Sequence, residues 1–111
     1  MYLLQHARFG EARSSLERAL AIDVAVHGPD HPAVAADLSS LAVVLRYLGQ
    51  SERARPLAER ALAIDEAVYG PDHPAVATAL SSLRMVLREL GQPEQARPLT
   101  ERALAITRAG M

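Results

Sequence analysis

The sequence predicts an all-α fold, a right-handed helix-turn-helix solenoid of about two and a half repeats, and three observations support it. First, residues 12–53 align without gaps on residues 54–95 with 30 of 42 positions identical, and residues 96–108 match 10 of the 13 positions of 54–66. Second, apolar residues within each copy recur three and four positions apart, as on one face of a helix. Third, proline and glycine stand where the helices would begin and end.

The first helix of each copy is predicted to begin at Pro32 or Pro74, because proline lacks the N–H that a helix start leaves unpaired. Gly49 and Gly91 follow the last periodic residue, where a left-handed C-terminal cap favours glycine. Between these limits the apolar face of the earlier copy comprises Val34, Leu38, Leu41, Leu45 and Leu48.

The second helix is predicted to begin with Ser51 as its N-cap, or at Pro93 in the next copy, and to end at Gly70. Pro56 and Pro98 lie about one turn inside this helix, where each removes one backbone hydrogen bond near the helix start. Its apolar face comprises Ala54, Leu57, Ala58, Ala61, Leu62 and Val68. No segment has the alternating pattern of a strand.

The whole chain, residues 1–111, is predicted to be one domain, with a partial first repeat at 1–30, a second at 31–72 and a third at 73–111. Six helices are expected, the first a stub from Tyr2 to about Ala7. Because stacked repeats cover each other, both ends of the array should leave apolar residues partly exposed. Three explanations of such ends stay open: a fragment of a longer array, homo-oligomerisation through the ends, or local folding back. The residues concerned are Leu16 and Leu20 at the front, and Leu99, Leu104 and Ile106 at the rear.

Composition excludes several classes of protein. The net charge is −1, whereas nucleic-acid binding requires clustered positive charge. No apolar run approaches the roughly 18 residues of a membrane helix, and the N-terminus lacks the pattern of a signal peptide. Cysteine is absent, which excludes disulfides and fits a reducing compartment, so a cytoplasmic location is expected.

The apolar and small positions of each copy resemble the signature of tetratricopeptide repeats. Counted from Ala35, the signature positions fall on Leu38, Leu41, Ala42, Leu45, Gly49, Ala54 and Ala61, and again on Leu80, Leu83, Leu87, Gly91, Ala96 and Ala103. The phrase A-L-A-I-D-E-A-V-Y-G-P-D-H-P-A-V-A is similar to the longer, 42-residue repeats of kinesin light chain. The chain departs from the family pattern at Glu66, where a signature proline is missing, and at Arg84, which replaces the small residue found at Ala42.

The resemblance implies a protein-interaction scaffold whose first helices line a concave groove. The implied groove residues are Ala36, Ser39, Ser40, Val43, Arg46 and Tyr47, followed in the next copy by Thr78, Ser81, Ser82, Met85, Arg88 and Glu89. Kinesin-like repeats often carry paired Asn where this chain has paired Ser. Arg46 and Arg88 have the geometry to grip carboxylates, so a peptide or protein partner with acidic residues around an apolar anchor is the hypothesis. In the alternative interpretation both arginines only solvate the surface.

A second functional hypothesis is structural: the apolar ends join copies of the chain, with no separate ligand. Catalysis is not expected, because the sequence contains neither a G-x-S-x-G turn nor a strand to carry one. Three arginine–glutamate pairs are spaced for ion pairs one helical turn apart: Arg13–Glu17, Arg55–Glu59 and Arg97–Glu101.

The four histidines do not predict a metal site, and no cofactor is expected. His27 and His31 are four residues apart, but Gly28 and Pro29 interrupt the helical turn between them. In the next copy the partner that His73 would need is a tyrosine. We expect instead that His31 and His73 close the loop before each first helix.

Overall fold

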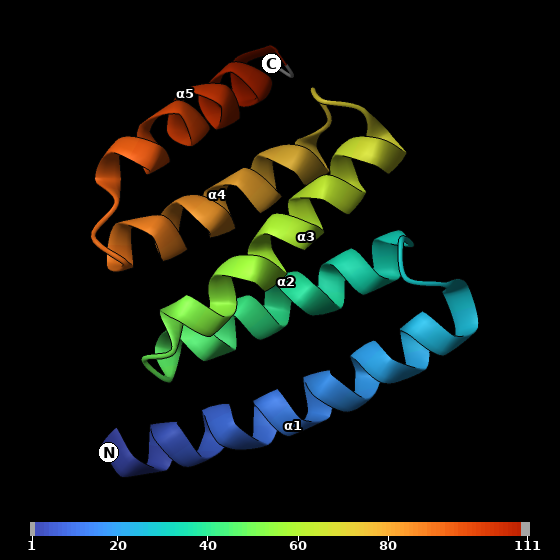
Figure 1. Ribbon diagram of the computed structural model, residues 1–111, viewed down its shortest axis with the longest axis vertical. Coiled ribbons are helices and arrows are strands. Elements are labelled where there is room, and N and C mark those ends of the chain that lie inside the picture. The colour runs from blue at the N-terminus through green and yellow to red at the C-terminus, as the bar shows by residue number, and fades with distance from the viewer. Residues whose placement is uncertain (1, 110–111) are drawn as a thin grey trace.

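The computed structural model describes the backbone of residues 2–109 and the side chains of residues 8–109. Five helices follow one another: α1 (Tyr2–His27), α2 (Pro32–Tyr47), α3 (Ser51–Tyr69), α4 (Pro74–Glu89) and α5 (Pro93–Ala109). Each helix packs on the next one in the chain, so that α1 and α5 lie at opposite ends of the stack (Figure 1). In addition α2 contacts α4 directly. The described residues therefore form the predicted all-α repeat fold.

The first helices begin where the prolines predict, and the histidines cap them. His31 and His73 precede α2 and α4 in extended conformation, and Nδ1 of each accepts a hydrogen bond of 3.0 Å from the backbone N–H two residues on. His27 stacks on His31 at 4.2 Å between ring centroids, and Tyr69 stacks on His73 at 4.3 Å. These contacts confirm that the two capping histidines close the loops.

Glycines end the helices as the sequence predicts. Gly49 and Gly91 have φ of +77° and +74°, and Gly70 after α3 has φ of +86°, a region that side chains disfavour. The start of α3 differs from the prediction, because Gln50 is the N-cap and Ser51 is already helical. The Ser51 hydroxyl does not cap its own helix; it donates instead to Glu89 of α4 over 2.8 Å.

The predicted stub is wrong, because α1 runs without a break from Tyr2 to His27. In the repeat alignment Ala7 occupies the place of Gly49, which ends α2. Alanine resists the left-handed conformation that this cap needs. The last turn of one helix type therefore continues directly into the next, and the chain forms five helices in its described part where six were expected.

The core is made almost entirely by small and branched residues in two neighbouring clusters. One cluster lies between α2 and α3: Val34, Ala35, Leu38, Ala61 and Ile64. The other extends from α2 to α5: Leu41, Ala42, Leu45, Ala54, Ala58, Leu62, Val76, Ala79, Leu80, Leu83, Val86, Leu87, Ala96 and Ile106. Leu20 and Leu57 pack against both clusters. The signature alanines Ala42, Ala54, Ala61 and Ala96 are buried between helices, where their small side chains allow close approach, whereas Ala103 is partly buried.

The two ends leave apolar side chains uncovered, but partly not those predicted. Leu104 of α5 is 48% exposed as expected, whereas Ile106 is only 5% exposed, so that prediction is wrong. Ile106 aligns with Ile64, and both pack on the first helix of their own repeat. At the other end Ile22 and Val26 are 61% and 68% exposed. The remaining predicted residues, Leu16, Leu20 and Leu99, are partly buried against the core.

Candidate binding groove between α2 and α4

A hollow lies where α2 and α4 meet, the two helices that carry the predicted groove residues. Its volume is about 150 Å³, and we call it the α2–α4 groove. Val43 and Met85 give it apolar walls, Arg46 a cation, and Thr78 and the serines hydroxyl groups. The lining residues are Ala42, Val43, Arg46, Thr78, Ser81, Ser82, Met85 and Val86. Six of the residues expected from the sequence thus line one hollow.

The other predicted residues lie outside this hollow. Ala36, Ser39 and Ser40 belong to the earlier turns of α2, and of these Ser39 is half-buried while Ala36 and Ser40 are exposed. Tyr47, Arg88 and Glu89 lie in the last turns of α2 and α4. The hydroxyl of Thr78 donates to the carbonyl of Pro74 over 3.3 Å, so its proton is engaged within its own helix.

Arg46 is already paired at the edge of the groove. Its Nη1 lies 3.0 Å from Oε1 of Glu89, and the other carboxylate oxygen of Glu89 accepts from Ser51. The guanidinium carbon of Arg46 lies 4.9 Å from the ring centroid of Tyr47, which stacks on Phe9 of α1 at 5.0 Å. This arrangement holds Arg46 rigidly and neutralises part of its charge.

Arg88 differs from Arg46 in its surroundings. Its side chain is exposed in the last turn of α4, and no hydrogen-bond or ion-pair partner is found for it among residues 8–109. The groove therefore contains one engaged guanidinium, that of Arg46, and an exposed guanidinium, that of Arg88, lies one turn beyond Met85 on α4. A carboxylate could reach Arg88 directly, but it would have to compete with Glu89 for Arg46.

The comparisons with known proteins agree with this architecture. The tetratricopeptide repeat model matches residues 2–67 and, in a second match, residues 40–109. The chain belongs to the tetratricopeptide repeat family. No curated protein matches this tetratricopeptide repeat chain significantly.

Solved structures relate these tetratricopeptide repeats to the kinesin light chain type. A crystal structure from Podosopora anserina, described as kinesin light chain nearly identical TPR-like repeats, superposes with a TM-score of 0.88 at 27% identity. It covers 96% of this chain and 51% of its own chain. A single-substitution variant of that protein gives a TM-score of 0.87, also at 27% identity, covering 96% of this chain and 50% of its own. The chain thus spans about half the length of these relatives.

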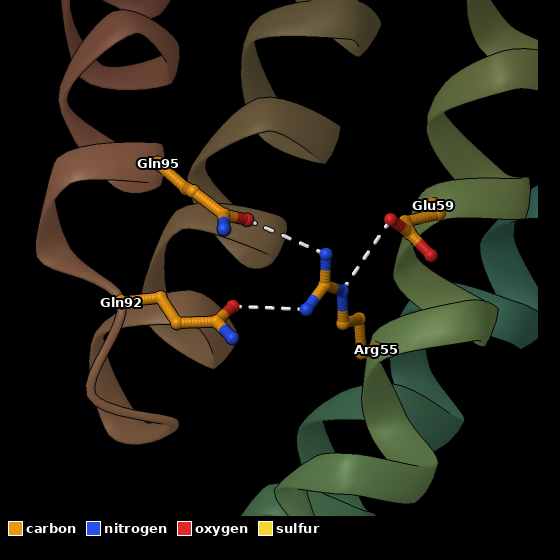
Figure 2. A network of polar contacts seen from close by, with 4 residues as sticks. All are labelled: Arg55, Glu59, Gln92 and Gln95. Carbon is orange, nitrogen blue, oxygen red and sulfur yellow. Dashed lines mark hydrogen bonds and ion pairs between the residues drawn. The ribbon is translucent and has the colours of Figure 1, made fainter.

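Contacts between repeats of this tetratricopeptide repeat protein were not predicted from the sequence. Figure 2 shows Arg55 of α3 donating to Gln92 over 2.9 Å, to Gln95 over 3.4 Å and to Glu59 over 3.5 Å. Only the contact with Glu59 follows from helical spacing and is confirmed. The partners in α5 and the turn before it are nearly one repeat away, so only an alignment of the copies would have suggested that they belong together.

Two of the three predicted helical ion pairs are wrong. Within the part of the chain whose side chains are described, neither Arg13–Glu17 nor Arg97–Glu101 forms an ion pair. A different arginine joins the last two repeats: Arg102 of α5 lies 2.5 Å from a carboxylate oxygen of Glu66 in α3. Glu66 occupies the place of the missing signature proline, so this departure from the family pattern supplies a contact between repeats.

Neither a metal-binding cluster nor a membrane-spanning helix is found in the described part of the chain. Among residues 8–109 no group of three His, Asp or Glu side chains is arranged to hold a metal ion. No helix in the described range combines the length and the apolarity needed to span a bilayer. Tetratricopeptide repeat scaffolds are typically non-enzymatic and generally mediate protein–protein interaction.

Proposed function

We propose that the protein is a non-enzymatic binding module that holds a peptide or protein segment in the α2–α4 groove. The supporting observation is that Val43, Met85 and one serine pair line one hollow with Arg46 at its edge; the pair is Ser81 and Ser82. Apolar walls suit an anchoring side chain, and hydroxyl groups suit the polar backbone around it. Ser39, Ser40 and Tyr47 extend the proposed surface along α2, as Arg88 and Glu89 extend it along α4.

The proposed ligand carries acidic residues beside the apolar anchor. Arg88 supplies an accessible guanidinium, and Arg46 supplies a second one once Glu89 is displaced. Loss of a charge-assisted hydrogen bond weakens binding about tenfold. We therefore expect Arg88→Ala alone to weaken binding of an acidic peptide, and the double replacement of Arg46 and Arg88 by Ala to abolish it.

The experiment uses a fluorescein-labelled peptide with one leucine flanked by Asp and Glu residues, and measures fluorescence anisotropy against the full chain. A peptide with Asn and Gln in place of the acidic residues is the ligand control, and Arg97→Ala, an exposed arginine on α5, is the protein control. Unchanged affinity in the double variant would reject the proposed role of the arginines. Equal affinity for the neutral peptide would reject the preference for acidic ligands.

Self-assembly is the second candidate, and the exposed Ile22, Val26 and Leu104 at the two ends favour it. In the interior α3 packs on α2 and α4, and its side chains Arg55 and Glu66 also reach Gln95 and Arg102 of α5. Joining α5 of one copy to α1 of another would likewise bring two second helices together. Light scattering at two well-separated concentrations tests this: assembly requires a mass that rises with concentration and falls in Ile22→Glu.

A further inference from the structure

A second hollow lies between α1, α2 and α3, away from the α2–α4 groove. It has a volume of about 420 Å³ and we call it the α1–α3 hollow. On α2, Leu41 and Leu45 face it, and each is about 200° around the helix from Val43 of the groove. The two sites are therefore on different faces of the molecule. The lining residues are Arg13, Glu17, Leu41, Leu45, Arg53 and Leu57.

The equivalent position in the next repeat shows how an arginine is paired when its acceptors are present. There the guanidinium of Arg55 has three acceptors, the side-chain oxygens of Glu59, Gln92 and Gln95 (Figure 2). Each of its three nitrogen atoms donates one of these hydrogen bonds. The residues 42 positions earlier are, in the same order, Arg13, Glu17, Gln50 and Arg53.

One substitution between the copies upsets this arrangement. Arg53 stands where Gln95 supplies an acceptor in the next joint, so an acceptor is replaced by a second cation. Arg53 also donates to the side-chain oxygen of Gln50 over 3.2 Å, which takes up the acceptor corresponding to Gln92. Nε of Arg13, whose counterpart in Arg55 donates to Glu59, is buried and has no hydrogen-bond partner.

Glu17 does not act as an acceptor for Arg13 in the way that Glu59 does for Arg55. Its side chain is exposed, and it forms no ion pair with Arg13 within the described part of the chain. The hollow thus contains two guanidiniums and one carboxylate that neither of them binds. A buried charged donor without an acceptor is costly, so an external acceptor entering the hollow would be favoured.

We propose that the α1–α3 hollow binds an oxyanion, a carboxylate or a phosphate group, between Arg13 and Arg53. Both groups match the planar fork of a guanidinium, and two arginines outweigh the single charge of Glu17. The leucines Leu41, Leu45 and Leu57 form the remaining wall, which suits the carbon atoms next to a carboxylate. This site is independent of the proposed peptide groove.

The test is an NMR titration of the full chain, following the side-chain Nε–Hε signal of Arg13. Sodium phosphate, sodium acetate and sodium hexanoate are added against sodium chloride at constant ionic strength. Arg13→Lys assigns the signal by its loss. We expect a saturable shift with phosphate or with a carboxylate, and if the leucines contribute, hexanoate binds more tightly than acetate.

Arg53→Gln is the most informative variant, because it places a glutamine beside Arg13 at the position that Gln95 occupies beside Arg55. The new glutamine would offer Arg13 the acceptor that Gln95 offers to Nη2 of Arg55, and the substitution removes one of the two cations. We expect oxyanion binding to weaken about tenfold, as for the loss of one charge-assisted hydrogen bond, while the Tm without oxyanion rises. Arg13→Gln should weaken binding similarly, and Arg97→Gln on α5 is the matched control that should leave it unchanged.

The titration with the three salts decides which class of ligand binds, or shows that the proposal is wrong. Saturation by phosphate alone assigns the site to phosphorylated ligands, and saturation by the carboxylates assigns it to acidic ones. Absence of saturation with all three salts overturns the proposal. It is equally overturned if Arg53→Gln and Arg13→Gln both bind the ions as tightly as the unaltered chain does.

Discussion

Two carboxyl groups meet in the joint between α1 and α2. Asp37 of α2 is half-buried, and its Oδ2 is buried without a hydrogen-bond partner. Burial, together with the neighbouring Asp23 carboxyl, raises the pKa of Asp37 from its ordinary 3.8 to about 6. In the next copy the aligned residue is Ala79, which packs in the core. Ionised Asp37 therefore opposes folding at a place where alanine fits.

Asp37→Ala is accordingly expected to raise the free energy of unfolding at neutral pH. Because the pKa in the folded state lies above the ordinary value, folded protein takes up the proton first as pH falls. The destabilisation by Asp37 is thus complete above about pH 6 and disappears towards about pH 4. Urea unfolding at about pH 7.5 and about pH 4.5 measures this, and the variant should gain clearly more at the higher pH. An equal gain at both values would contradict the assigned cause.

At the scale of the helix, the predicted helix limits are accurate where a proline or a glycine determines the backbone conformation. Pro32 and Pro74 begin helices and Gly49 and Gly91 end them, because φ restriction and left-handed freedom act within one or two residues. The uninterrupted α1 was not predicted. The repeat alignment suggested a turn at residue 7, but this residue is alanine, whereas the aligned residue that ends α2 is Gly49. Repeat periodicity suggested the turn, and the local chemistry of the residue decided against it.

The same glycine-to-alanine change should have opposite effects in and beyond a helix. Gly10 lies inside α1 with open space where a Cβ would stand, so Gly10→Ala should stabilise by up to about 1 kcal/mol. Gly49 also has open space, but its φ of +77° makes Gly49→Ala destabilising by about 1–2 kcal/mol. Urea unfolding followed by circular dichroism compares them. Two changes of the same sign would show that backbone conformation is not the determining factor.

For the molecule as a whole, contacts between repeats limited what the sequence could predict. The resemblance placed Val43, Ser81 and Met85 on one surface, because equivalent helices of each repeat share an orientation. It did not predict that Arg46 pairs with Glu89, since the two residues are 43 positions apart and belong to different repeats. The sequence also could not predict whether a side chain faces its own repeat or the following one, because this depends on how the helices stack.

Leu62 and Leu104 isolate this effect of position in the stack. They are the same residue at the same place in successive repeats, but Leu62 is 9% exposed in the core while Leu104 is 48% exposed. Leu62→Ala should destabilise by about 2–4 kcal/mol, because it removes packed methyl groups and leaves a cavity. Leu104→Ala should change the free energy of unfolding by less than about 1 kcal/mol, as expected of a surface site.

Urea unfolding at low and high protein concentration measures both variants and also bears on self-assembly. A cost for Leu104→Ala that is small at both concentrations means that water covers this face of α5. A cost that grows with concentration until it approaches that of Leu62→Ala means that another copy covers it, because burial in a contact stabilises only the associated form. A large cost that does not depend on concentration would contradict the described exposure of Leu104, because it would mean that contacts within one chain bury Leu104 as they bury Leu62.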